Sequence, residues 1–206
     1  MDNTICYLCG KPVFAIEENI DHVPQRGFFL KKNPNGIIEL KTHIQCNLKY
    51  SYDEQYVVTL IRSTANWDLT AERIWEKRGK NNLLNIKKIG LIKKILNETN
   101  FISGFPVTQP DKERIQRVLD KIVKGLYFNE FSKTIESGCF VIDDNEFLHK
   151  QARWRVEEPN SISIGEEFKY FKRILNGDME YNLFFYNIHY FRLLYRKKSM
   201  FYKLKI

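Results

Sequence analysis

The sequence predicts an α+β fold, with a small N-terminal module over residues 1–65 and a basic region of helices and antiparallel sheet over 66–206, packed on it. Three observations predict it. Pairs of metal-ligand side chains stand at both ends of the first 65 residues, an amphipathic helical pattern covers 110–125, and aromatic and polar residues alternate after 137. A chain of 206 residues is long enough to bury a substantial core.

The N-terminal module reads as a strand, a hairpin and a helix. Residues 5–12 predict a strand end followed by a tight turn, which Gly10 and Pro12 mark. Residues 13–23 form an extended run up to Pro24, and 28–40 form a second one that the turn sequence at 33–36 interrupts. Thr42 is a suitable N-cap, and the apolar spacing predicts a helix over 43–62.

The region after residue 66 predicts helices and then a sheet. Helices are expected over 70–79 and 82–97, and an extended stretch over 101–108. The helix over 110–125 has Pro110 before it, acidic residues in its first turn and Gly125 as its expected end. From 137 onward, the alternating aromatic pattern predicts several short antiparallel strands.

The net positive charge lies entirely outside the N-terminal module. The chain has a net charge of +8, yet its first 66 residues contain seven basic and seven acidic side chains. Residues 71–95 contain eight basic and two acidic side chains, and 181–206 contain six basic and none acidic. This distribution favours an anionic partner for the second region, although lysine and arginine also solvate ordinary helix faces.

Several classes of protein are excluded by pattern. The sequence has no phosphate-binding or dinucleotide-binding glycine motif and no zinc-protease or deaminase signature. It has no apolar run long enough to span a membrane, and its first residues do not form a secretory signal, so we expect a cytoplasmic protein. Four cysteines are too few for a secreted disulfide scaffold and instead favour metal or redox chemistry.

Two pairs of soft ligands predict a structural zinc site. Cys6 and Cys9 form a C-x-x-C pair, and His43 and Cys46 form an H-x-x-C pair at the expected start of a helix. Each pair spans a tight turn, so both can reach one ion, and three thiolates with one imidazole are a standard zinc ligand set. A C-x-x-C pair alone also occurs in redox proteins, and His43 alone would be an ordinary helix-capping residue.

A second set of side chains predicts a hard metal site. Asp21 and Asn47 offer oxygen ligands for Mg²⁺, and a neutral His22 can take a proton from water. Strand alternation would turn Asp21 and His22 to opposite faces unless the backbone bends, which Pro24 favours. If zinc closes the hairpin onto the helix, these three residues approach one cation and could hydrolyse a phosphodiester. Asp53 and Glu54 could add ligands, although a solvated helix face is the simpler interpretation.

These motifs resemble the HNH endonuclease family in its zinc-containing ββα-metal form. C-x-x-C, D-H-V-P and H-x-x-C-N occur in that order, with 11 residues between Cys9 and Asp21 and 20 between His22 and His43. The resemblance covers about residues 5–60. It extends more loosely to bacterial "DHVPP"-type HNH proteins through Ser51–Tyr56 (S-x-D-E-x-Y), 71–77, 121–127 and the strand at Phe185–Tyr186.

The resemblance implies a ββα-metal fold and a catalytic centre. His22 would be the general base, Asp21 and Asn47 would hold Mg²⁺ or Mn²⁺, and Cys6, Cys9, His43 and Cys46 would hold zinc. The asparagine of the hairpin loop that positions the base would be Asn35, with Asn33 as the second choice. In zinc-free relatives a histidine near the position of His43 binds the catalytic metal instead, so both assignments of His43 stay open.

The sequence therefore predicts a metal-dependent HNH endonuclease that acts on DNA, with RNA as a second possible substrate. Two alternatives remain. The protein could be a non-catalytic zinc module that binds nucleic acid. It could also be a nuclease subunit that is active only with a protein partner, as in phage-defence operons, which is an analogy with the family.

Overall fold

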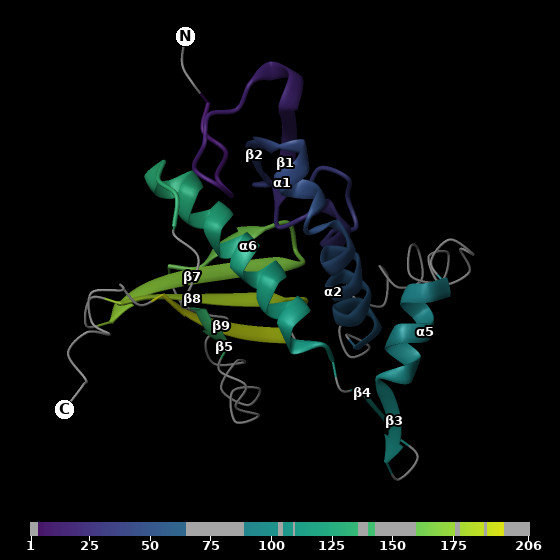
Figure 1. Ribbon diagram of the computed structural model, residues 1–206. Helices are drawn as coiled ribbons and strands as arrows, with labels where there is room; N and C mark the ends of the chain where they lie inside the picture. Colours follow the sequence, from purple (N-terminus) through teal and green to yellow (C-terminus); the bar gives the residue numbers. More distant parts are fainter. Residues whose placement is uncertain are drawn as a thin grey trace, which may run out of the picture.

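The computed structural model has the α+β architecture, and Figure 1 shows how its elements are arranged. The structure describes residues 4–64, 89–102, 105–108, 110–135, 140–142, 160–175, 178–187 and 189–195. The helix predicted over 70–79 and the first part of the one predicted over 82–97 lie outside these residues. Among the helices described, none combines the length and apolar character that crossing a lipid bilayer requires.

The N-terminal elements follow in the order hairpin and helix. Strands β1 (Glu18–Val23) and β2 (Ile38–His43) pair antiparallel, and helix α1 (Ile44–Leu48) starts directly after β2. Short 3₁₀ turns precede and follow β1, at η1 (Ala15–Glu17) and η2 (Arg26–Phe28). The register sets Asp21 opposite Leu40 and His22 opposite Glu39. Asp21 and Leu40 are buried while Glu39 is exposed, so the hairpin has one inner and one outer face.

Two predictions about the first helix are wrong. Thr42 does not cap it: Thr42 is buried within β2, and His43 occupies the N-cap position without a capping side-chain bond. A β-branched residue suits a buried strand position, and the Thr42 hydroxyl lies 3.1 Å from the Cys6 sulfur. The predicted helix over 43–62 is two helices, since α1 ends at Leu48 and α2 (Ser51–Thr64) begins after a turn.

Helix α5 (Ile89–Asn97) precedes a two-stranded hairpin of β3 (Thr99–Ile102) and β4 (Phe105–Thr108), which confirms the extended stretch predicted there. The long helix α6 (Lys112–Phe131) has Asp111 as its N-cap, and the Asp111 side chain accepts a hydrogen bond from the Arg114 N–H. Its C-cap is Ser132, which has a left-handed backbone conformation. The prediction that Gly125 ends this helix is wrong: Gly125 lies inside α6, at a close contact with β1.

The C-terminal part is an antiparallel sheet, as predicted. Its strand order is β5-β9-β8-β7-β6, and neighbouring strands pair antiparallel. The strands are β5 (Phe140–Ile142), β6 (Ile162–Ile164), β7 (Phe168–Leu175), β8 (Asp178–Phe185) and β9 (His189–Tyr195). Helix α6 lies across one face of this sheet, beside α2 (Figure 1).

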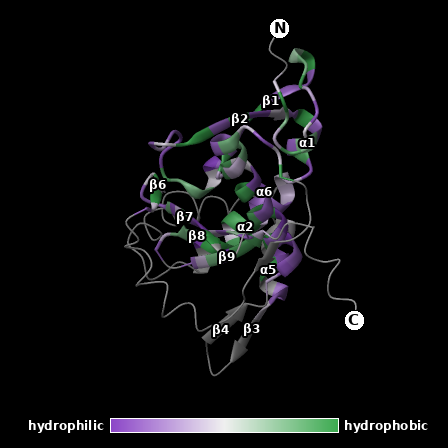
Figure 2. Ribbon diagram, turned by 90° about the vertical axis from the view of Figure 1, so that its left-hand side faces the viewer, coloured by the Kyte–Doolittle hydropathy of each residue, from purple (hydrophilic) through white to green (hydrophobic). Residues whose placement is uncertain are grey.

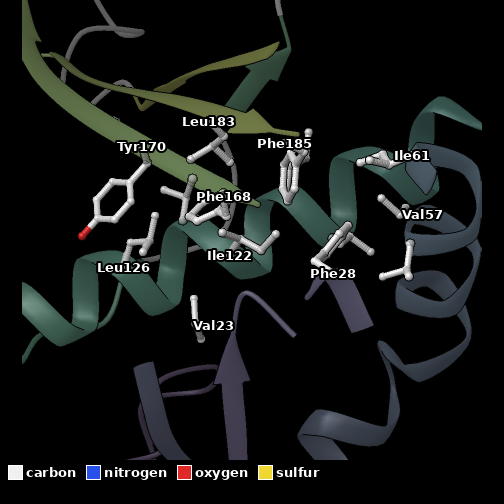
Figure 3. Close-up of a cluster of buried hydrophobic side chains, with 14 of the residues drawn as sticks. Val23, Phe28, Val57, Ile61, Ile122, Leu126, Phe168, Tyr170, Leu183 and Phe185 are labelled. Carbon is white, nitrogen blue, oxygen red and sulfur yellow. The ribbon is translucent and has the colours of Figure 1, made fainter. Parts of the chain in front are cut away.

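One buried cluster joins the N-terminal hairpin, α2, α6 and the sheet. Figure 3 shows Ile122 and Leu126 of α6 beside Phe168 and Leu183 of the sheet, with Val23 of β1 on the other side of the helix. In Figure 2, hydrophobic segments of α2 and α6 lie in the middle of the molecule. Helix α6 is therefore the central element, and one of its sides reaches the candidate site.

Candidate functional site

The first part of the site is a tight turn that carries two cysteines. The Cys6 N–H donates to the Lys11 carbonyl at 2.9 Å, and the Gly10 N–H donates to the Cys6 carbonyl at 2.8 Å. Gly10 has φ of +73°, a left-handed conformation that glycine adopts without strain. Ile5 and Pro12 form a β-bridge below the turn. The loop therefore turns back on itself and brings the Cys6 and Cys9 sulfurs to the same side.

The end of β2 and the first turn of α1 bring the other two ligands. The ligand atoms of Cys6, Cys9, His43 and Cys46 all lie within 4.8 Å of one another. The His43 Nδ1 atom is 3.4 Å from the Cys9 sulfur and 3.8 Å from the Cys46 sulfur. The His43 Nε2 atom is 2.9 Å from the Pro12 carbonyl oxygen, a contact that places the ring proton on Nε2 and leaves Nδ1 free to ligate. A Cys₃His cluster of this kind could hold a metal ion such as zinc.

The protonation of the thiols fits a site for a cation. Burial raises the pKa of the Cys6 thiol, but hydrogen bonds from Thr42 and from backbone N–H groups outweigh it and lower this pKa to about 6. Burial raises the pKa of Cys46 to about 12, and the neighbouring thiols Cys9 and Cys6 raise it in the same direction. One thiolate therefore opposes the ionisation of the next, and a divalent ion would remove that opposition.

A second cluster lies on the inner face of the hairpin. Three oxygen atoms from three elements surround the Nζ atom of Lys121, which projects from α6. These oxygens are Asp21 Oδ2 of β1 at 2.8 Å, Asn47 Oδ1 of α1 at 2.8 Å and Glu54 Oε1 of α2 at 2.5 Å. Asp21 and Asn47 thus come together around one cation, as the sequence indicated. That cation is a lysine ammonium.

This second cluster is deeply buried. The exposed fraction is 4% for Asp21, 8% for Glu54 and 2% for Lys121. The Tyr7 hydroxyl donates to Asp21 Oδ2 at 2.5 Å, and burial, with the Asp21 charge, raises the pKa of Tyr7 well above its usual value. Burial also raises the pKa of Glu54, although the Lys121 ammonium opposes this effect. The carboxylates are therefore held in a low-dielectric environment by Tyr7 and Lys121.

His22 lies on the opposite face of β1 from Asp21. Its Nε2 atom is 3.1 Å from Glu39 Oε1, and the same carboxylate oxygen is 3.3 Å from Arg26 Nη2. The pairing of β1 and β2 is regular through His22, so the alternation of a strand is kept and Pro24 produces no bend at this residue. The structure thus brings Asp21 and Asn47 together and places His22 in a separate pair with Glu39.

The hairpin-loop asparagines lie away from both clusters of polar side chains. Asn35 is exposed, and its carbonyl accepts a hydrogen bond from the Gly165 N–H at 3.0 Å. It lines a cavity of about 210 Å³ with Leu30, Lys31, Pro34 and the turn at 165–167. Asn33 is exposed in the same loop. The loop therefore packs on the C-terminal sheet.

Sequence patterns did not assign a role to two residues of the buried cluster, although Lys121 begins the segment 121–127 of the looser resemblance. Lys121 lies 74 positions from Asn47 in an amphipathic helix, where a lysine normally marks a solvated face. Tyr7 is the residue after Cys6 and resembles any core aromatic residue. The helical spacing of Glu54 to Asn47 allows it as a ligand, and in the structure its carboxylate contacts the same Lys121 Nζ atom. Asp53 instead pairs with Arg117 at 2.7 Å and Arg114 at 3.5 Å.

Comparisons of the chain with models of known protein families, with curated proteins and with solved structures find no match.

Proposed function

We propose that the protein is a metal-dependent endonuclease of the HNH type, with DNA as its substrate. The observation that carries the proposal is that two sets of possible metal ligands lie close together, where the β1–β2 hairpin meets helix α1. The Cys₃His cluster connects the turn at 6–9 to the start of α1, and one residue further along, Asn47 meets Asp21 at a buried cation. Soft ligands outside and hard ligands inside match the chemistry of a structural zinc and a catalytic Mg²⁺ or Mn²⁺.

Cys6, Cys9, His43 and Cys46 would hold the zinc. The sulfurs of Cys6 and Cys9 come from the N-terminal turn and that of Cys46 comes from α1, so the ion would fix the turn on the helix. His43 belongs to this thiol cluster, which favours the zinc assignment over a role at the hard site. The role of such a closed four-ligand site is structural.

Asp21 and Asn47 would hold the divalent cation at the inner site, which when bound would supply positive charge for the phosphodiester in its transition state. His22 would take the proton of the attacking water as a new P–O bond forms and one P–O ester bond breaks. Glu39 holds the His22 ring on the outer face, so catalysis requires that His22 leave this contact and that the backbone of β1 rearrange to bring the ring to the inner face. The resemblance gives Asn35, in the loop, as the positioning residue for this base.

The charge supports a nucleic-acid substrate. The net charge of +8 lies wholly after residue 66, and Lys31 and Lys32 are exposed in the loop of the hairpin. Such lysines would contact backbone phosphates, and this kind of contact carries affinity without much sequence preference. Thiolate ligands for zinc suit a reducing compartment, so we propose a cytoplasmic location.

The experiment is cleavage of supercoiled plasmid DNA by the full chain with Mg²⁺ or Mn²⁺, beside a single-stranded RNA. Wild type should cut DNA, and H22A and D21N should each lose activity by about 10²-fold or more. The matched control is H189A, because His189 lies in β9 of the C-terminal sheet. Full activity of H22A, or equal losses in H22A and H189A, would exclude the proposed mechanism.

One observation favours a second candidate, a zinc module that binds nucleic acid without cutting it. The Lys121 ammonium already pairs with both carboxylates at the site where the catalytic metal would bind and partly neutralises them. Retained DNA binding without cleavage under any divalent metal would support this candidate. Cleavage that appears only when a partner from a phage-defence operon is added would instead support a partner-dependent nuclease.

A further inference from the structure

Lys121 is the least expected residue in the inner cluster. It is 2% exposed, and its three N–H donors are matched by three acceptors, which are Asp21, Asn47 and Glu54. A lysine is rarely buried so completely unless it is paired. A bound phosphate would find no free donor on this nitrogen and would meet two carboxylates. The environment of Lys121 is therefore that of a cation in a cation site.

The ammonium and a metal ion would compete for the same oxygen atoms. Asp21 Oδ2 already accepts from the Tyr7 hydroxyl at 2.5 Å and from Lys121 at 2.8 Å, so both of its lone pairs are used. Mg²⁺ needs oxygen atoms at about 2.0–2.1 Å. A metal ion at Oδ2 must therefore replace Lys121 or Tyr7. Two positive charges in one buried pocket would also repel each other.

The three oxygen atoms form a hard ligand set. Two carboxylates and an amide oxygen come from β1, α1 and α2, and they already converge on one point. Glu54 brings the second negative charge. With Lys121 present, the positive charge of one ammonium compensates both carboxylates only in part. A divalent ion would balance them fully, with water or a substrate oxygen completing its coordination.

The fold holds the backbone of Lys121 firmly, while its side chain has four rotatable bonds. Gly125, one helical turn further along α6, lies against Val23 of β1, and Ile122 lies in the core. The Tyr50 ring lies 5.4 Å from Nζ, so the ammonium also has an aromatic face beside it in the closed site. A change of the Lys121 side chain is therefore the movement that would open the site.

We propose that Lys121 is a built-in cation that closes the divalent-metal site of Asp21, Asn47 and Glu54, so that a metal ion binds only when the lysine side chain withdraws. This inference rests on the proposed function for the identity of the site, and it adds Glu54 as the third ligand. The resting protein is then a latent form. Its apparent metal affinity is the affinity of the open site multiplied by the small fraction of molecules in which Lys121 is withdrawn.

The test is direct Mn²⁺ binding by the full-length, zinc-loaded chain, measured by electron paramagnetic resonance and calorimetry without nucleic acid. K121M keeps the length of the side chain and removes its charge. It should bind Mn²⁺ at least about tenfold more tightly than wild type. The matched control is K124M, because Lys124 is a second buried lysine of α6, 3% exposed, that pairs with Asp120. K124M should bind Mn²⁺ as wild type does.

Glu54 is tested in the same background. Adding E54Q to K121M should remove most of the gained affinity, because the site then loses one of its two carboxylates. Circular dichroism and zinc content establish that each variant is folded. If K121M does not fold, K121Q replaces it, since its amide still donates to a carboxylate, and the same gain is expected.

Equal Mn²⁺ affinity of wild type and the folded Lys121 variant would overturn the inference, as would a gain that E54Q leaves unchanged. The plasmid assay separates this from the proposed function. A gain in Mn²⁺ binding without cleavage by any variant would keep the closed site and exclude the nuclease. Cleavage by wild type, with Mn²⁺ affinity equal to that of K121M, would keep the nuclease and exclude the closed site.

Discussion

Gly125 of α6 lies directly against Val23 of β1. A Cβ atom built on Gly125 would be 2.5 Å from Cγ2 and 2.8 Å from Cγ1 of Val23, distances that real Cβ atoms do not show. Lys121 lies one turn before Gly125 on α6, and Asp21 lies two residues before Val23 on β1, so the two pairs share facing sides. The close approach at Gly125 therefore sets the distance at which Lys121 meets Asp21.

Replacing Gly125 should destabilise the protein. In G125A the methyl group must push α6 and β1 apart, and we expect a loss of about 1–3 kcal/mol in the free energy of unfolding. We expect this net loss even though alanine itself favours a helix interior over glycine by about 1 kcal/mol. Urea unfolding followed by circular dichroism measures the difference.

The control for this prediction is V23A together with G125A. V23A alone leaves a cavity, but in the double variant the new methyl group occupies part of it. The double variant should therefore lose less free energy of unfolding than the sum of the two single losses. G125A with wild-type stability, or strict additivity of the two changes, would show that α6 and β1 are not in contact at this point.

Removing the zinc ligands should disorder the N-terminal turn. Purified wild type should contain about one zinc ion per chain, and H43A should contain almost none. Because a bound ion at a structural site contributes directly to folding, residues 4–17 should lose protection from hydrogen exchange in H43A, as they should after chelation of wild type. Metal analysis and exchange mass spectrometry measure both effects.

H22A is the matched variant, since it also removes a histidine from the hairpin but leaves the Cys₃His cluster intact. It should keep its zinc and the protection of residues 4–17. Zinc content that falls equally in H22A and H43A would contradict the assignment of His43 to the cluster.

The inner cluster should show strong energetic coupling between Lys121 and Glu54. Breaking a buried ion pair by removing one partner costs about 3–5 kcal/mol, and K121M should lose an amount in this range. Adding E54Q removes one of the two stranded carboxylates, so the double variant should be more stable than additivity predicts by about 1–3 kcal/mol. A double-mutant cycle in urea, with zinc present, measures this coupling energy.

The pair Lys172 and Glu130 offers the comparison, because it is an ion pair at the surface. The same cycle there should give a coupling energy of at most about 1 kcal/mol. A coupling energy as small between Lys121 and Glu54 would show that the inner cluster is open to water.

Asp111, at the start of α6, should make the free energy of unfolding depend on pH. The Asp111 side chain accepts from the Arg114 N–H, and the hydrogen bond from Lys94 lowers the pKa of Asp111 below its usual 3.8. D111A should therefore lose about 1 kcal/mol near neutral pH. Because the folded-state pKa lies below the unfolded one, this contribution is present above about 3.8 and disappears as the pH falls through the lowered value.

D111S separates the two roles of this residue. Serine still caps the helix but cannot pair with Lys94, so D111S should recover most of the stability at neutral pH and show no acid-dependent part. Urea unfolding of the three proteins between pH 7 and pH 3 gives the differences. A loss in D111A that is equally large at both ends of this range would contradict the ionic contribution.

The hairpin loop should contribute to DNA affinity through charge. Lys31 and Lys32 are exposed, and loss of two phosphate contacts should reduce the slope of log affinity against log salt by about 2. Fluorescence anisotropy with duplex DNA over a range of salt measures this slope for K31A/K32A. K112A, a change of an exposed lysine at the start of α6, should leave it almost unchanged. Equal slopes for all three proteins would exclude the loop as a phosphate contact.

Local patterns were sufficient for much of the fold. The alternation of aromatic and polar residues predicted the C-terminal sheet, and the apolar spacing around Ile122 predicted α6. The Cys₃His cluster could be predicted because its ligands come in pairs with a fixed spacing. Each of these signals lies within a few residues, where backbone geometry determines which side chains meet.

The remainder depended on contacts between distant segments. Glycine is a residue type that commonly ends helices, but at Gly125 the close contact with Val23 of β1 requires a glycine inside the helix. Thr42 is a good N-cap by residue type, yet it lies at a buried position of β2, where its hydroxyl contacts the Cys6 sulfur. Lys121 looks like a solvating lysine, and only the packing of α6 against the hairpin places it beside two buried carboxylates. No local pattern contains this information.

The counter-charge of the hairpin is supplied late in the chain. During synthesis, Asp21 and Glu54 leave the ribosome well before Lys121, which follows Glu54 by 67 positions. Until α6 has emerged and folded, the nascent N-terminal module must keep these two carboxylates in water, because burying them unpaired is costly. The N-terminal module therefore completes its interior only after the helix has been translated, so maturation of the one depends on arrival of the other.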